Sequence, residues 1–206
     1  MKRKRIQISV LTNGWIRKEL AMKLIQWLRK CPYDIYLEFT EERPIAHCRN
    51  RIVRDFLKRN YDFLLMIDND VVPEKNPLDL VELDKDVIIL PCPIYQAGRI
   101  IWNVYRLDKE GYWRPINLKK EKRKLIKIEA GGTGSILIKK NVLQKIDAPF
   151  ERVFTKKGIE KMGLDLFFSR KLKEKGFSIY ASVRHKCSHY KTLDLRTIQN
   201  KWLTIS

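Results

Sequence analysis

A short apolar run that ends in two carboxylates constrains the fold of this chain more than any other stretch. Phe63–Ile67 is continuously apolar, which is typical of a strand buried on both faces of a sheet. Asp68-Asn69-Asp70 follows at once, and two carboxylates this close repel each other and are costly to bury. Open α/β sheets bind ligands at the carboxyl ends of their parallel strands. We therefore expect a divalent cation with a phosphate-bearing ligand here, although the same residues before Pro73 also suit a plain turn.

The segments around this run alternate between strand and helix patterns. Strand-like runs at 5–11, 33–39, 63–67 and 87–90 alternate with apolar residues at helical spacing in 16–28, 45–56 and 78–83. Strand followed by helix, repeated three times, predicts an α/β fold. We expect a three-layer α/β/α sandwich with a mostly parallel central sheet.

The pattern changes after residue 92. Aromatic, β-prone segments at 100–106 and around Trp113 flank Asp108-Lys109-Glu110-Gly111, which predicts a hairpin. The glycine-rich segment 131–134 follows, and then come a strand at 135–138, a short helix at 141–146, a loop at 154–162, a helix from Gly163 to Gly176, a strand at 177–181 and a last helix over 193–205. No internal repeat or linker is evident, so we predict a single domain over residues 1–206.

The charge balance is the outlier of the composition. A chain of 206 residues with 44% hydrophobic content is typical of a globular protein, and no apolar run approaches the ~20 residues that cross a bilayer. The formal net charge of +19 attracts polyanions: nucleic acid, an anionic membrane surface or phosphorylated substrates. The densest basic run, 119–124, is typical of a solvated loop. The basic leader 1–5 precedes too short an apolar stretch for a signal peptide, so we expect a cytoplasmic protein.

The cysteines and histidines leave one metal hypothesis open. The four cysteines show no CxxC pair, which favours reduced thiols. His185, Cys187 and His189 alternate, so in an extended segment they would share one face and could form part of a zinc or copper site. Their spacing suggests no fourth ligand, and a lone histidine is more often structural.

Two further segments carry groups that could serve a site. Gly131-Gly132-Thr133-Gly134 lacks the lysine of a phosphate-binding loop and does not match a dinucleotide fingerprint. It is either a tight turn or a place where the backbone approaches a ligand closely. Asp165 stands at a predicted helix start, where aspartate is favoured as a cap but is also placed to accept a proton from an attacking hydroxyl.

The order of these motifs is itself informative. Along the chain come Arg49-Asn50-Arg51, Asp68-Asn69-Asp70, Gly131-Gly132-Thr133-Gly134, Gly163-Leu164-Asp165-Leu166-Phe167-Phe168, Gly176-Phe177 and His189. This succession resembles the small, family-2-like glycosyltransferases of the GT-A fold, over roughly residues 6–189 but not over 94–125. The resemblance implies a Rossmann-like nucleotide-diphospho-sugar transferase domain. Its nucleotide-binding half would cover about 1–92, its acceptor-binding half about 93–190, and a tail 191–206.

The resemblance also implies a role for each motif. Asp68-Asn69-Asp70 looks like the DxD motif, in which Asp70 would bind Mn²⁺ or Mg²⁺ on the donor diphosphate and Asp68 would contact the ribose or the metal. Asp165 aligns with the general base of inverting members, and His189 with the histidine that completes the metal shell. The donor-nucleotide contacts fall on Thr12, Asn13, Arg49, Asn50, Asp68 and Asn69, and the sugar and acceptor pocket on Gly131, Gly132, Thr133 and Gly134.

The implied activity is a metal-dependent, inverting transfer of the hexosyltransferase type. A sugar would move from a UDP- or GDP-sugar to a hydroxyl of a glycan, lipid or protein acceptor. Asp165 would deprotonate the acceptor as it attacks the anomeric carbon, while the metal neutralises the departing nucleoside diphosphate. Leu164 stands where the family has an acidic residue before the base, which leaves the acceptor contacts open.

Other functions also remain open. The charge and the acidic pair fit a nucleic-acid-binding protein or a metal-dependent nuclease, although no recognition motif is present. A nucleotidyltransferase would need a glycine-rich signature near the N-terminus, and residues 11–14 do not form one. A catalytically inactive GT-A-like domain would serve as a binding module. The basic surface further suggests peripheral contact with an anionic membrane.

Overall fold

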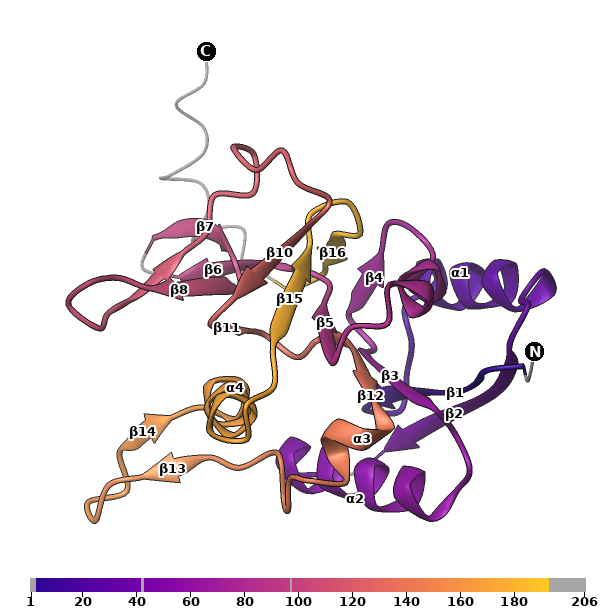
Figure 1. Cartoon of the computed structure of the whole chain (residues 1–206), viewed down its shortest axis with the longest axis horizontal. Coiled ribbons are helices and arrows are strands. Elements are labelled where there is room, and N and C mark those ends of the chain that lie inside the picture. The colour runs from indigo at the N-terminus through magenta and orange to yellow at the C-terminus, as the bar shows by residue number, and fades with distance from the viewer. Residues whose placement is uncertain (1–2, 42, 97, 193–206) are drawn as a thin grey trace.

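A seven-stranded sheet forms the centre of the molecule (Figure 1). The computed structural model describes residues 3–41, 43–96 and 98–192, and the expected helix over 193–205 lies outside them. The strands, in their order across the sheet, are β10 (Leu125–Ile128), β15 (Ile179–Ser182), β5 (Val87–Ile89), β12 (Ser135–Lys139), β3 (Phe63–Asp68), β1 (Arg5–Thr12) and β2 (Asp34–Glu41). The run with the two carboxylates is therefore a central strand, as predicted.

Five of these seven strands point in the same direction. β1 pairs in parallel with β2 and β3, and β5 pairs in parallel with β15, whereas β12 runs antiparallel between β3 and β5, and β10 runs antiparallel at the edge. The predicted mostly parallel sheet is confirmed. The reversal of β12 was not predicted, because a buried apolar run reads the same in either direction. β12 is reversed because the glycine-rich segment before it lies at the carboxyl end of β3, where the Asp68 amide donates to the Gly134 carbonyl at 2.8 Å.

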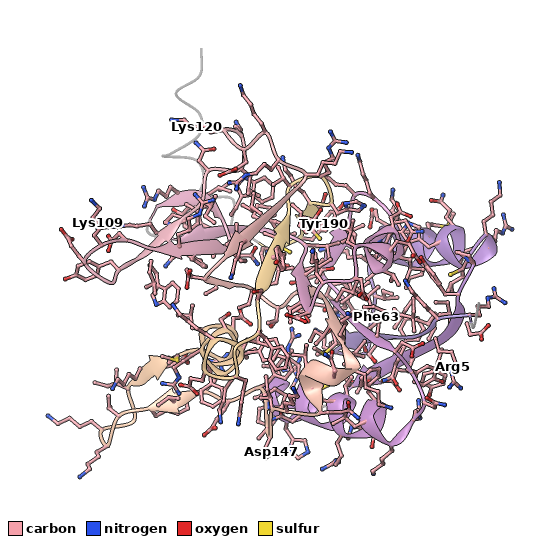
Figure 2. All side chains as sticks on the ribbon, viewed as in Figure 1. Arg5, Phe63, Lys109, Lys120, Asp147 and Tyr190 are labelled. Carbon is pink, nitrogen blue, oxygen red and sulfur yellow. The ribbon has the colours of Figure 1, made fainter. Side chains whose placement is uncertain are left out.

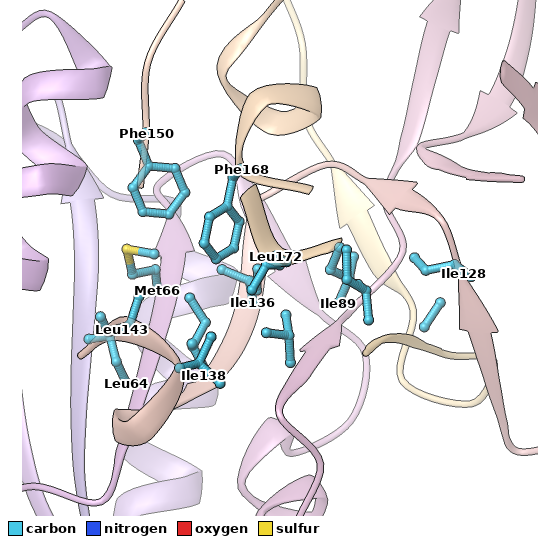
Figure 3. Close-up of a cluster of buried hydrophobic side chains, with 14 of the residues drawn as sticks. Leu64, Met66, Ile89, Ile128, Ile136, Ile138, Leu143, Phe150, Phe168 and Leu172 are labelled. Atoms are coloured by element: carbon cyan, nitrogen blue, oxygen red, sulfur yellow. The ribbon is translucent and has the colours of Figure 1, made fainter. Parts of the chain in front are cut away.

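Helices cover both faces of the sheet and complete three layers (Figure 1). Along β3 the side chains alternate: Leu64 and Met66 belong to the core on the side of α2 (Ile45–Lys58), α3 (Lys140–Leu143) and α4 (Leu164–Glu174). Phe63, Leu65 and Ile67 belong to the core on the side of α1 (Lys18–Arg29). This two-sided burial is why the run is continuously apolar. Figure 3 shows the α2 side, where Phe150 and Phe168 pack over Met66.

The helix boundaries follow local signals. α2 begins directly after Pro44, and α4 begins after Gly163 and is followed by Gly176, whose φ of +77° favours glycine. The segment predicted as a helix at 78–83 is a 3₁₀ helix, η1 (Pro77–Leu83), and the Asn76 side chain accepts from the Leu78 amide at its start. α3 is shorter than the predicted 141–146. No described helix has both the length and the apolar character needed to cross a membrane.

Short ladders accompany the central sheet. Three are hairpins: β6 (Pro93–Gln96) with β7 (Arg99–Trp102), β8 (Val104–Leu107) with β9 (Trp113–Pro115), and β13 (Val153–Phe154) with β14 (Glu160–Met162). Two pair distant segments: β11 (Ala130–Gly131) with β8, and β4 (Val71–Pro73) with β16 (Cys187–His189). The predicted hairpin around residues 108–111 is confirmed. The predicted loop at 154–162 is wrong, because Gly158, with φ of +75°, lets the chain reverse into β14. The ladder is too short to give an alternating pattern in the sequence.

Candidate functional site

The turn after β3 places its three polar residues at the carboxyl edge of the sheet. Asp68 is the last residue of the strand, and the Asn69 amide donates to the Leu11 carbonyl at the end of β1. The Asn69 side-chain amide donates to Asn13 Oδ1 at 2.6 Å and to the Trp15 carbonyl at 3.0 Å. Asn69 therefore joins the ends of β3 and β1 and leaves the carboxylates of Asp68 and Asp70 to serve the site.

Asp68 is paired with an arginine that is itself inside the protein. Arg49, from α2, is 2% exposed, and its Nη2 donates to Asp68 Oδ1 at 2.6 Å. Burial of the Asp68 carboxyl raises its pKa to about 6, because desolvation outweighs the attraction of Arg49 and the carboxylates of Asp165 and Asp70 add to the rise. The anionic form of Asp68 is therefore only partly compensated by protein groups.

Arg49 also connects Asp68 to the proposed base. Its Nη1 donates to the Thr133 carbonyl at 2.9 Å, and the Thr133 hydroxyl donates to Asp165 Oδ1. Asp165 lies in the first turn of α4, and Thr133 is buried in the glycine-rich segment. A hydrogen-bonded chain thus runs from Asp68 through Arg49 and Thr133 to Asp165, and it joins four separate segments of the sequence.

Asp70 has different partners from Asp68. Lys191 Nζ lies 2.6 Å from Asp70 Oδ2, and His189 Nε2 lies 3.6 Å from the same oxygen. Burial alone would raise the pKa of the Asp70 carboxyl, but the contacts with His189 and Lys191 outweigh burial and lower it to about 2. Asp70 is therefore an anion at neutral pH.

The surroundings of His189 suit a metal ligand. Its Nδ1 lies 2.8 Å from the Pro93 carbonyl oxygen, which can only accept, so Nδ1 carries the proton and Nε2 faces Asp70. Imidazoles that bind metals commonly use one nitrogen in this way and coordinate with the other. In the described residues no three carboxylate, imidazole or thiolate groups are close enough together to hold a metal ion. Asp70 and His189 are in contact with each other, whereas Asp68 Oδ1 accepts a hydrogen bond from Arg49. The donor chemistry of these residues fits a divalent cation.

Two cavities meet at the acidic pair. The larger has a volume of about 630 Å³ and the smaller about 400 Å³, and Asp68, Asp70 and Lys191 line both. The smaller is completed by residues at the end of β1 and the start of α2: Leu11, Thr12, Asn13, Arg43, Pro44, Ile45, Cys48 and Asn69. Volumes of this order suit small-molecule ligands.

The larger cavity lies between the hairpins and α4. Tyr105 and Trp113 come from the β8–β9 hairpin, and Asp165 and Leu164 from the start of α4. Burial, with a contribution from the charge of Asp165, raises the pKa of the Tyr105 hydroxyl. The cavity therefore combines aromatic side chains with a carboxylate that can accept a proton.

The glycine-rich segment passes so close to its neighbours that side chains would not fit. A Cβ on Gly132 would lie 2.1 Å from Asn103 Nδ2, and one on Gly134 would lie 3.3 Å from Asp68 Oδ2. Gly131, Gly132 and Gly134 line the larger cavity, whereas Thr133 points into the protein toward Asp165. Glycine is required here because the backbone itself forms the wall beside the acidic pair.

The structure brings together most of the predicted site residues. Thr12, Asn13 and Asn69 line the smaller cavity, Asp165 and His189 the larger, and Arg49 lies behind both. Asn50 is set apart, because its side-chain amide donates to the Phe150 carbonyl at 2.7 Å and its oxygen accepts from the Phe150 amide at 3.0 Å. Asn50 holds the backbone before the β13–β14 hairpin.

The alternating His185, Cys187 and His189 do not form a metal site. Cys187 is buried with its thiol near the Leu90 carbonyl, and His185 Nδ1 lies 3.0 Å from Ser182 Oγ. Only Cys187–His189 is extended, as β16, so the three side chains do not share a strand face, and the zinc or copper hypothesis is wrong. The four cysteines form no disulfide, in agreement with the predicted reduced thiols.

Sequence reasoning missed several residues that line the site. Lys191 carries no motif, although a basic residue two positions after His189 could have suggested it. Tyr105, Trp113 and Arg99 fall in the part of the chain where no resemblance was found. Only the folding of the hairpins against α4 brings them to the cavity.

Comparison with known proteins supports the fold. No protein family and no curated protein matches the chain. Among solved structures, A197 from STIV is 25% identical, with a TM-score of 0.62 over 91% of this chain and 86% of its own. GalNAc-T7, crystallised with UDP, GalNAc and Mn²⁺, is 12% identical, with a TM-score of 0.54 over 93% of this chain and 44% of its own. This chain thus spans less than half of GalNAc-T7.

A third neighbour matches over nearly its whole length. A putative glucose-1-phosphate thymidylyltransferase from Bacillus anthracis is 12% identical, with a TM-score of 0.52 over 100% of this chain and 97% of its own. The neighbours thus include a glycosyltransferase and a nucleotidyltransferase with GT-A-like folds. At these identities the likeness establishes the fold, and the predicted GT-A-like α/β architecture is confirmed.

Proposed function

We propose that the protein is a metal-dependent glycosyltransferase that uses a nucleoside-diphosphate sugar. The observation that carries this proposal is the meeting of two cavities at Asp68 and Asp70, with Asp165 lining only the larger one. A donor with a nucleoside at one end and a sugar at the other needs two adjoining compartments with its diphosphate between them. The arrangement matches that need.

The donor would bind across the junction. Thr12 and Asn13 would contact the nucleoside in the smaller cavity, and the sugar would enter the larger cavity beside the glycine-rich segment. Lys191, which lines both cavities, would contribute positive charge to the diphosphate. Arg49 would act from behind by holding Asp68 in place.

Mn²⁺ or Mg²⁺ would be held by Asp70 and His189, which already adjoin, and by Asp68, which would have to move toward them. Bound there, the ion would neutralise the charge of the departing nucleoside diphosphate. The partly compensated carboxyl of Asp68 and the orientation of His189 by Pro93 support this assignment. Mn²⁺ is also present with UDP in the crystal of GalNAc-T7.

Asp165 is the group best placed to act as general base. Thr133 donates to its Oδ1, which fixes the carboxylate at the wall of the larger cavity. Asp165 would take the proton of the acceptor hydroxyl as that oxygen bonds to the anomeric carbon, and the bonding electrons of the sugar–phosphate bond would leave with the diphosphate. A single displacement of this kind inverts the anomeric centre. Leu164, beside the base, gives that part of the wall an apolar character.

The nucleic-acid alternative has less support at this site. Four carboxylates line the larger cavity, those of Asp68, Asp70, Glu160 and Asp165, against three basic side chains, those of Arg99, Arg152 and Lys191. The cavity therefore has no excess of positive charge that would hold a polyanion. The basic excess of the chain lies outside it.

The test is a thermal-shift panel of UDP, GDP, CDP and their sugars, each with and without Mn²⁺. We expect one nucleotide to stabilise the protein only when Mn²⁺ is present, by about 2.7 kcal/mol at a hundredfold excess over its dissociation constant. Asp70→Asn should abolish the shift. Asp55→Asn, a carboxylate on α2 paired with Lys58, is the matched control and should retain it.

Two results would count against the proposal. A shift that Asp70→Asn leaves intact would place the nucleotide elsewhere. A panel without any shift, together with salt-dependent binding of duplex DNA, would favour the nucleic-acid function instead.

A further inference from the structure

The β13–β14 hairpin presents apolar side chains on a well-formed turn. Phe154 is 53% exposed and Ile159 is 64% exposed. The Thr155 amide donates to the Ile159 carbonyl at 2.8 Å, and the Gly158 amide donates to the Thr155 carbonyl at 2.9 Å. The hydrogen bonds across the turn hold these two apolar side chains in solvent, where their exposure is unfavourable unless something covers them.

The β8–β9 hairpin continues the apolar surface toward the larger cavity. Leu107 and Trp113 are cross-strand partners, two positions from the pair Tyr105 and Pro115 on the same face. Tyr105, Trp113 and Pro115 line the larger cavity, and Tyr112, at the turn, is 63% exposed. An apolar strip therefore leads from the hairpin turn to the cavity.

The positive charge lies mainly on β13–β14. Residues 152–162 hold four basic side chains against one acid, Glu160, and Arg152 pairs with that acid at 2.6 Å. Among the described residues no ion pair engages Lys156, Lys157 or Lys161. The β8–β9 turn is balanced, since Arg114 pairs with Asp108. We call the two turns, residues 107–113 and 154–159, the hairpin rim.

The two parts of the hairpin rim lie on the same side of the molecule. In Figure 1 both hairpins project to the left, away from α1, and Figure 2 labels Lys109 at the β8–β9 turn. Trp113 from one hairpin and Arg152 and Glu160 from the other line the larger cavity. The cavity thus lies between the two apolar turns.

We propose that the hairpin rim docks on an anionic lipid bilayer, so that the larger cavity receives a lipid-anchored acceptor; the second part rests on the proposed function. Aromatic and aliphatic side chains enter the interfacial region of a bilayer while lysines contact anionic headgroups. A nucleic acid would be held by the lysines, but it would gain little from exposed aliphatic groups such as Leu107 and Ile159.

The test is flotation of the full chain with vesicles. One set contains phosphatidylcholine alone, and the other contains phosphatidylcholine with about 30% phosphatidylglycerol. We expect binding to the anionic set, and Lys156→Gln with Lys157→Gln should weaken it about 30-fold. Phe154→Ser with Ile159→Ser should weaken it about tenfold or more.

Matched controls come from α1, on the other side of the molecule. Met22 and Ile25 are 56% and 51% exposed, and Lys18 and Lys30 are exposed nearby. Met22→Ser with Ile25→Ser, and Lys18→Gln with Lys30→Gln, should leave vesicle binding within about twofold of the parent chain. Melting temperatures of all variants show whether they are folded.

Three outcomes would overturn the proposal. The first is no binding to anionic vesicles, and the second is equal loss in the α1 variants. The third is loss with the lysine variant but not with the Phe154 and Ile159 variant, which would indicate a general polyanion surface. The nucleotide thermal-shift panel on the same variants separates the two proposals. Vesicle binding without any nucleotide shift would leave the docking surface standing while the proposed function fails.

Discussion

The two cavities that meet at the acidic pair are built in different ways. The smaller one lies where the parallel strands β1 and β3 end and α2 begins, and most of its wall consists of the residues at those strand ends and at the start of the helix. The larger one needs the β6–β7, β8–β9 and β13–β14 hairpins to pack near α4. The first follows from strand order, as in other open α/β sheets, whereas the second depends on contacts between distant segments.

The carboxylates at their junction differ in the same way. Asp68 is held inside the protein by Arg49, and burial raises its pKa, whereas Asp70 meets His189 and Lys191, which lower its pKa. Only one residue, Asn69, separates them in the sequence. The difference teaches that the partners of each carboxyl decide its charge, not the motif that contains both: α2 supplies the partner of Asp68, and β16 with the residues after it supplies those of Asp70.

Asp165→Asn should separate the chemistry of the larger cavity from binding in the smaller one. We expect transfer to fall about 10²- to 10⁴-fold, because the general base is lost. The nucleotide thermal shift should remain. Glu160→Gln, which changes a carboxylate lining the same cavity, is the matched control and should retain most of the activity. A larger loss of activity with Glu160→Gln than with Asp165→Asn would show that Asp165 is not the general base.

Arg49→Ala should damage both cavities at once. It leaves the Asp68 carboxyl, which is 25% exposed, without its cation, so the free energy of unfolding should fall by about 1–3 kcal/mol. Urea denaturation measures this change. Arg54→Ala, an exposed arginine on the same helix, should change stability by about 0.5 kcal/mol or less. Equal losses of stability in the two variants would mean that the contacts of Arg49 with Asp68 and Thr133 do not stabilise the protein.

The pH dependence of stability should distinguish the two aspartates. The native pKa of Asp68, about 6, lies above its usual value of 3.8, so the native state keeps a proton that the unfolded state has lost. Stability should therefore fall as the pH rises from 3.8 to 6, by up to about 3 kcal/mol. Denaturation of the chelator-treated protein measures the slope.

The variants Asp68→Asn and Asp70→Asn make this prediction specific. The first should remove the fall in stability over that range. The second should keep most of it, because the native pKa of Asp70 lies near 2, below the range, and the charge of Asp70 adds only part of the rise at Asp68. A slope that persists in Asp68→Asn would arise from another group.

Gly132→Ala should affect the wall of the larger cavity. Its Cβ would lie 2.1 Å from Asn103 Nδ2, and Asn103 is held in place because its Oδ1 accepts from the Cys92 amide. We expect a loss of about 1–3 kcal/mol of stability. Gly163→Ala is the control, since its nearest neighbour is the flexible end of Glu160. Thermal melting compares them, and an unchanged Gly132→Ala would show that the wall can move.

Most of the sheet could be predicted because its signals are local. The apolar run at 63–67 and the apolar residues at helical spacing in α1 and α2 indicate burial by residue type alone. All three segments belong to the buried core, as predicted. The direction of β12 and the β13–β14 hairpin were not predictable. The first depends on where the preceding glycine-rich segment lies, and the second on a ladder too short to leave a pattern.

The candidate site was predictable only in part. Asp68, Asp70, Asp165 and His189 were found by motif, and they line one cavity. Asn50 was expected at the donor nucleotide, but it holds the backbone of Phe150. Lys191 and Trp113 were missed, because neither stands in a motif and both reach the site through packing.

The amino-acid sequence by itself determined the α/β class, the central strand and the carboxylates at its end. Each depends on the residue type and on near neighbours, which the chain carries locally. The tertiary structure alone decided that Arg49 and Thr133 connect Asp68 to Asp165 and that two cavities meet at the pair. Residues 49, 68, 133 and 165 are far apart in the sequence. The type of a residue does not indicate which distant residue it will contact after folding.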